Sequence, residues 1–172
     1  YKMIKVFIVL LVILISNVQI AKADRAKDLY QQGLAYAAEL DFREAEKIFN
    51  NFIANYPKHN RYKDAQYWLG RIYFAQKKFE ESAIILAEFN SKYPEDSRFQ
   101  EIALIIVESV SNYASQKDVC RISNQSIATI SNPKYKKRIN KILISNKCKE
   151  KQYKDINNFS KVKIPTKRLV SE

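Results

Sequence analysis

The residues of this chain that could perform chemistry are few. Its one histidine, His59, lies between Lys58 and Asn60 in a polar stretch typical of a surface turn, whereas a serine or cysteine nucleophile usually needs a positioned histidine. Paired carboxylates such as Glu80-Glu81 fall near predicted helix starts, where the helix dipole favours negative charge. With two glycines in all, the chain has no glycine-rich phosphate loop. We therefore expect no catalytic residues, no cofactor and no small-molecule substrate.

The two cysteines, Cys120 and Cys148, leave two alternatives open. In an oxidising compartment they could form a disulfide. Alternatively, Cys120 packs as a free thiol at a small position of the core. Two cysteines and one histidine at these spacings do not make a zinc site, so we expect no metal.

The strongest pattern is a repeat with a period of 37 residues. Aromatic, small and proline residues recur at matching positions of the two copies. The first copy contains Tyr30, Gly33, Tyr36, Phe42, Phe49, Tyr56 and Pro57, and the second contains Tyr67, Gly70, Tyr73, Phe79, Leu86, Tyr93 and Pro94 in the same order. A fixed period of this length is typical of a solenoid, in which each unit buries its apolar face against its neighbours. Such a surface favours binding over catalysis.

Each copy predicts two helices. In the second copy they cover residues 65–76 and 79–92, with a turn at Lys77-Lys78 and a stop at Tyr93-Pro94, because proline disfavours helix in the residue before it. A glycine inside a helix costs about 1 kcal/mol relative to alanine. Its recurrence at Gly33 and Gly70 predicts that a bulky side chain of the partner helix needs the space.

These positions resemble the tetratricopeptide repeat (TPR). The resemblance implies an all-α solenoid of about three helical pairs plus a capping helix, within residues 24–148. The expected units are 28–57, 65–94 and 99–133, followed by a cap at 134–148. Residues 149–172 are rich in lysine and are expected to form a basic flexible tail.

Residues 1–23 have the layout of a secretory signal peptide. Lys2 and Lys5 precede an apolar run from Val6 to Ile15, and the small residues Ala21 and Ala23 follow. We expect export to the periplasm with cleavage after Ala23; an uncleaved membrane anchor is the alternative. No cysteine lies near this point, which argues against the lipid-modified export route.

Charge is divided unevenly along the chain. Residues 24–116 have a net charge of −2, whereas residues 117–172 carry +11. The basic end is interpreted either as a solvated tail or as a region attracted to an anionic envelope surface. Export and the lack of a recognised motif argue against nucleic-acid binding.

The block Ala65–Gly70, the segment Tyr93–Ser97 and the turn Lys117–Cys120 resemble the Tol–Pal system protein YbgF (CpoB) family. The resemblance implies a periplasmic adaptor that contacts TolA and the peptidoglycan synthesis machinery, and links envelope constriction in cell division to wall synthesis. The chain is also similar to BamD, an outer-membrane-protein assembly factor. BamD is a lipoprotein, whereas this chain has no cysteine near Ala23 to carry a lipid. This difference favours the YbgF (CpoB) family.

The TPR resemblance also implies a protein-binding groove lined by the first helix of each pair. The residues carried over to it are Lys27, Tyr30, Leu34 and Ala38 in the first unit, Asp64, Tyr67, Arg71 and Phe74 in the second, and Leu104, Glu108 and Asn112 in the third. Tyr30, Tyr67, Arg71 and Phe74 are the strongest candidates, because aromatic residues and arginine dominate interface energetics.

Overall fold

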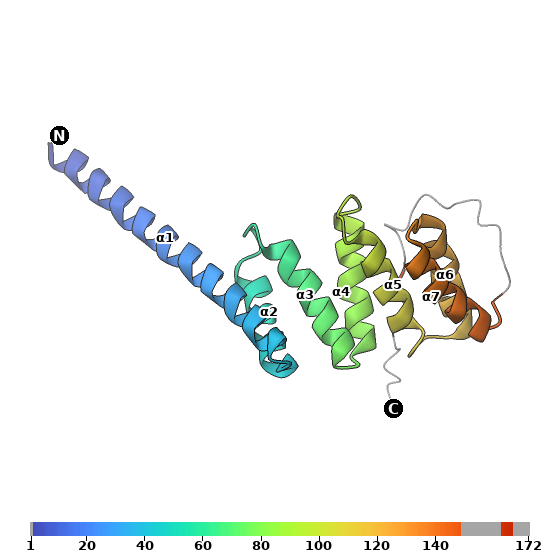
Figure 1. Ribbon diagram of the computed structural model, residues 1–172. Coiled ribbons are helices and arrows are strands. Elements are labelled where there is room, and N and C mark those ends of the chain that lie inside the picture. The colour runs from blue at the N-terminus through green and yellow to red at the C-terminus, as the bar shows by residue number, and fades with distance from the viewer. Residues whose placement is uncertain (1, 149–162, 167–172) are drawn as a thin grey trace, which may run out of the picture. The chain divides into compact units, whose positions relative to one another are not determined.

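The computed structural model describes residues 2–148 and 163–166, and all its regular structure there is helical (Figure 1). The helices are α1 (Lys2–Ala38), α2 (Phe42–Asn55), α3 (Tyr62–Ala75), α4 (Phe79–Lys92), α5 (Phe99–Val110), α6 (Gln116–Thr129) and α7 (Pro133–Ser145). This confirms the predicted all-α, TPR-like solenoid. The chain divides into two compact units, Tyr1–Ala65 (unit 1) and Gln66–Glu172 (unit 2).

Local signals in the sequence set the helix ends. The side chains of Asp41, Ser115 and Asn132 accept hydrogen bonds from backbone N–H groups in the first turns of α2, α6 and α7. The C-cap residues of α2 and α4 are Tyr56 and Tyr93, each directly before a proline. The predicted turn at Lys77-Lys78 and the turn between α1 and α2 each contain a residue in the left-handed region, Lys77 and Leu40, both with φ of 62°.

In unit 1, α1 packs on α2. Helix α1 runs without a break from the predicted export signal into the first repeat, and apolar side chains such as Met3, Phe7 and Leu14 are exposed near its start. No helix of the described residues is both long and apolar enough to span a membrane.

The glycine positions bring paired helices close together, as predicted. A Cβ built on Gly33 would lie 2.9 Å from Cζ of Phe49 in α2, and one on Gly70 would overlap the Leu86 side chain in α4. The absence of a Cβ at Gly70 also leaves its carbonyl open to Ser82, whose hydroxyl donates to it at 2.9 Å. Each helical pair is thus fitted around a fully buried side chain of its second helix.

In unit 2, α4 packs on α5, and α5, α6 and α7 contact one another (Figure 1). The core combines buried residues of these helices, among them Leu86, Phe89, Ile106, Ile122 and Ile139. A disulfide joins Cys120 in α6 to Cys148, just after α7, with their Cα atoms 5.3 Å apart. It connects the third repeat to the cap.

Of the predicted tail, the structure describes only residues 163–166; residues 149–162 and 167–172 lie outside the described part. Lys163, Ile164 and Pro165 contact the helices of unit 2. Ile164 packs against the core, and the Tyr113 hydroxyl donates to the Pro165 carbonyl at 3.0 Å. These three residues therefore lie against the helices of unit 2, and the expectation of a flexible tail over the other residues lies outside the described part.

We predict that Gly70→Ala lowers the free energy of unfolding by about 1–3 kcal/mol, because overpacking against Leu86 outweighs the roughly 1 kcal/mol gained in helix propensity. Urea denaturation of single and double variants provides the measurement. In a Leu86→Ala background the same substitution should be neutral or stabilising. Equal destabilisation in both backgrounds would contradict the proposed fit.

Replacing both cysteines by serine should reduce stability by about 3–4 kcal/mol, because the disulfide spans 28 residues and restricts the unfolded chain. Denaturation with and without a reducing agent measures the effect. Reduction should destabilise the natural chain and leave the double-serine variant unchanged; a natural chain insensitive to reduction would show that the bridge contributes nothing.

Candidate functional site

Three polar side chains meet on unit 2 at the junction of α3 and α5. The Arg71 guanidinium donates to the Tyr67 hydroxyl at 2.9 Å, and this hydroxyl donates to Glu101 Oε1 at 3.0 Å. Arg71 and Glu101 also form an ion pair at 3.7 Å. Since Arg71 and Tyr67 lie one turn apart on α3 whereas Glu101 lies on α5, the cluster depends on the packing of successive repeats.

Tyr67 is buried, with 6% of its surface exposed, whereas 44% of the Arg71 side chain and 33% of the Glu101 side chain remain exposed. Burial raises the pKa of the Tyr67 hydroxyl above its ordinary value; Arg71 opposes this rise and Glu101 adds to it. The phenol therefore remains a protonated donor at neutral pH. Because the Arg71 side chain is exposed, its remaining N–H groups can donate to another molecule.

Arg98, which the sequence interpretation missed, supports this cluster. Its guanidinium lies over the Tyr67 ring, 4.8 Å from the centroid, and over the Phe89 ring at 5.1 Å. Asp96 holds it with two hydrogen bonds, of 2.8 and 2.9 Å. The 37-residue period offered a signal for Arg98, because Arg61 precedes it by one period.

Unit 1 contains the corresponding arrangement. The Arg61 guanidinium lies 5.6 Å from the centroid of the Tyr30 ring. The backbone N–H of Arg61 donates to His59 Nδ1 at 3.1 Å, just as the N–H of Arg98 donates to Asp96 at 3.0 Å. His59 thus occupies the repeat position of Asp96 and orders a turn.

A cavity of about 450 Å³ adjoins the Tyr67 cluster in unit 2. Its walls include Arg98 and Glu101 on one side and Asn132 and Tyr135 on the other. Gln100 fixes this end of the cap, since its Oε1 accepts from the backbone N–H groups of Ser131 and Asn132 at 2.8 and 2.9 Å. The lining supplies donors and acceptors suited to a polar chain. No cluster of the described residues could hold a metal ion.

The other predicted groove residues lie in different environments. Lys27, Ala38 and Asn112 are exposed, Leu34 and Phe74 are half-buried, and Asp64 pairs with Arg61 at 3.2 Å. Glu108 forms an ion pair with Arg138 of α7, and burial raises the pKa of this carboxyl despite the opposing arginine. Tyr30 and Leu104 are buried, with 6% and 2% of their surface exposed, and contribute mainly to packing.

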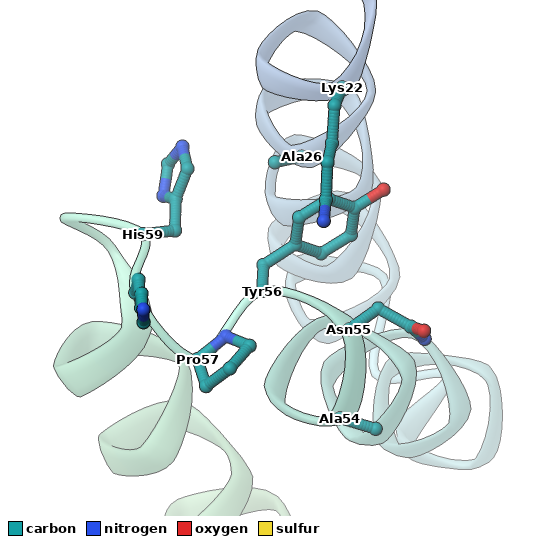
Figure 2. A pocket seen from close by; sticks show the side chains of 8 residues that line it. Lys22, Ala26, Ala54, Asn55, Tyr56, Pro57 and His59 are labelled. Carbon is teal, nitrogen blue, oxygen red and sulfur yellow. The ribbon is translucent and has the colours of Figure 1, made fainter. Parts of the chain in front are cut away.

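A second cavity, of about 610 Å³, lies in unit 1 (Figure 2). Lys22 of α1 extends along it, with its ammonium 5.9 Å from the centroid of the Tyr56 ring, and Pro57 and His59 line the opposite side. Because Lys22 belongs to the predicted export signal, cleavage after Ala23 would remove part of the wall.

The basic charge of the C-terminal region is concentrated on α7 as far as the structure describes it. Lys134, Lys137 and Lys141 recur at helical spacing and are exposed, without an ion pair among the described residues. Arg138 on the same helix is neutralised by Glu108. The outer face of α7 is therefore a lysine surface, here called the α7 lysine face.

Comparison with known proteins gives one family. The curated proteins contain no match to this chain. A family model described as YfiO, outer membrane lipoprotein, matches residues 22–158 and so includes all the repeats. This match agrees with a TPR-type envelope protein and gives no specific support to the YbgF (CpoB) family. The chain therefore belongs to the YfiO family of outer membrane lipoproteins.

Proposed function

We propose that this protein is an exported envelope adaptor that binds another protein through the surface of unit 2 around Tyr67, Arg71 and Glu101. The observation that carries the proposal is the exposed, pre-oriented Arg71 guanidinium, held by the Tyr67 hydroxyl and by Glu101. Arginine and aromatic residues are enriched among the residues that dominate protein interfaces. Pre-orientation also lowers the entropy lost when a partner binds.

The neighbouring groups favour a protein partner. The Arg71 guanidinium lies 5.4 Å from the centroid of the Trp68 ring, so a partner carboxylate paired with Arg71 would also contact an aromatic surface. The cavity beside Arg98 and Glu101 has room for a partner side chain. A solenoid with this arrangement can bind a protein partner by ion pairs and aromatic contacts, without a catalytic residue.

The family match supports a role at the outer membrane, and the similarity to BamD extends it to outer-membrane-protein assembly. The Tol–Pal role, with TolA and the peptidoglycan machinery as partners, rests only on the resemblance of Ala65–Gly70, Tyr93–Ser97 and Lys117–Cys120 to the YbgF (CpoB) family. Neither cysteine of this sequence is free to carry a lipid, because Cys120 and Cys148 are bonded to each other. We therefore base the proposal on the repeats and not on a lipid anchor.

A second candidate function follows from the α7 lysine face: attachment to an anionic envelope surface. Lysine ammonium groups act as point charges and need no exact partner geometry, which suits phospholipid headgroups. Each lysine near such a surface contributes about 1 kcal/mol at low salt. This attachment would hold the adaptor at the membrane while unit 2 binds its partner.

Arg71→Glu should reduce the amount of envelope partner captured with the tagged full chain after crosslinking in a Gram-negative host, by at least about tenfold if Arg71 dominates the interface. Mass spectrometry of the captured proteins provides the measurement. Arg43→Glu, a matched reversal at an exposed arginine of α2, serves as control. Unchanged capture by Arg71→Glu, or loss of its helical circular dichroism, would refute the assigned surface.

The identity of the captured proteins distinguishes the two roles. Proteins of outer-membrane assembly, lost in the Arg71→Glu sample, would support the assembly role. Recovery of TolA or of wall-synthesis proteins would instead support the Tol–Pal role and contradict the assembly role.

The triple variant Lys134→Gln, Lys137→Gln and Lys141→Gln should bind vesicles of phosphatidylglycerol and phosphatidylethanolamine much more weakly, because it removes about 3 kcal/mol of electrostatic attraction. Flotation at low and high salt measures binding. A control variant with Lys77, Lys92 and Lys117 changed to glutamine has the same net charge and should bind like the natural chain. Equal loss in both would show that net charge, and not the α7 lysine face, determines attachment.

A further inference from the structure

The segment Lys163–Thr166 occupies a defined site on unit 2. The Tyr113 hydroxyl donates to the carbonyl of Pro165 at 3.0 Å, and the Arg121 guanidinium donates to the carbonyl of Lys163 at 2.9 Å. Between these two hydrogen bonds, Ile164 packs against the hydrophobic core. The segment has no regular secondary structure, so its backbone is available to side chains of the repeats.

The Arg121 guanidinium is positioned by two residues at the start of α6, Ser115 and Asp118. Ser115 caps α6 and donates to Asp118 at 2.8 Å, and Asp118 accepts from Arg121 at 2.9 Å. The hydrogen bond from Arg121, followed by that from Ser115, holds the pKa of Asp118 below its ordinary value. The first turn of α6 therefore fixes the guanidinium that reaches the Lys163 carbonyl.

Tyr113 is a permanent donor in this site. Burial raises the pKa of its hydroxyl well above the ordinary value, and the nearby Glu80, Asp118 and Glu81 add to the rise. The hydroxyl thus stays protonated throughout the physiological range and offers one O–H to an acceptor. In this structure the acceptor is a backbone carbonyl.

The two kinds of contact have different consequences for selectivity. Backbone carbonyls are common to every peptide, so the hydrogen bonds from Tyr113 and Arg121 recognise an extended backbone without selecting a sequence. Selection falls to Ile164 and Pro165, the two side chains of the segment that become partly buried. Proline has no N–H to leave unpaired and restricts the unbound chain, which lowers the entropy lost on docking.

We propose that Tyr113 and Arg121 form a docking site for an extended peptide in which a branched apolar residue precedes proline, and that Lys163–Thr166 of the same chain is its occupant. This site is separate from the proposed partner surface, since none of its residues belongs to the Tyr67 cluster. Because the segment is covalently attached, its effective concentration at the site is on the order of millimolar. A free peptide of the same chemistry must displace it in order to bind.

The test uses a fluorescein-labelled peptide with the sequence of residues 160–167. It is added to the full chain carrying Ile164→Ser, in which the attached segment docks more weakly on the site. Fluorescence anisotropy should show saturable binding to this variant and an apparent affinity at least about tenfold weaker for the natural chain, where the attached segment competes. Adding Tyr113→Phe to the Ile164→Ser chain should weaken peptide binding by about fivefold through loss of one hydrogen bond.

A peptide in which serine replaces the isoleucine serves as the matched control and should not bind. Circular dichroism of each variant verifies that the helices remain folded. The proposal would be overturned if the peptide failed to bind the Ile164→Ser chain, bound the natural chain equally well, or was indifferent to Tyr113→Phe.

Discussion

The close approach of paired helices at Gly33 and Gly70 is the constraint on which the rest of the structure depends. Phe49 and Leu86 occupy the space that a Cβ would need, so each pair is fixed in register by one contact. In unit 2 this approach also admits the hydrogen bond from Ser82 to the Gly70 carbonyl. Tyr67 and Arg71 stand on the same helix as Gly70, and their positions follow from this register.

A tyrosine–arginine contact accompanies each glycine. Arg61 lies over Tyr30 in unit 1 and Arg98 lies over Tyr67 in unit 2, which ties the turn after each pair to the first helix of that pair. Unit 2 adds the exposed Arg71 to the shared framework, and Glu101 holds it in place. The geometry that the two repeats share thus stabilises the fold, and we propose that Arg71, which lies outside the repeated pattern, contributes the surface for binding.

The sequence was sufficient to predict the all-α class of the fold, the turn at Lys77-Lys78 and the role of the glycines, because these depend on local spacing and on proline and glycine. The TPR resemblance named Tyr67 and Arg71 as groove residues of the second unit, but it did not indicate Arg98, whose contact with Tyr67 depends on the path of the turn through Asp96. Burial of Leu104 was equally inaccessible, because helical spacing does not tell which of two apolar faces is covered. The docking of Ile164 depends on a contact between residues far apart in the sequence, which no local pattern encodes.

The most direct test of the central claim, that this protein acts through the surface around Tyr67 and Arg71, is photo-crosslinking in the envelope. A photoreactive residue would replace the exposed Ala75, one turn after Arg71 on α3, in one variant and the exposed Glu88 of α4 in another, so that Arg71 itself is kept. A defined crosslinked partner is expected from position 75 and none from position 88. Crosslinks of equal yield from both positions, or from position 88 alone, would contradict the claim.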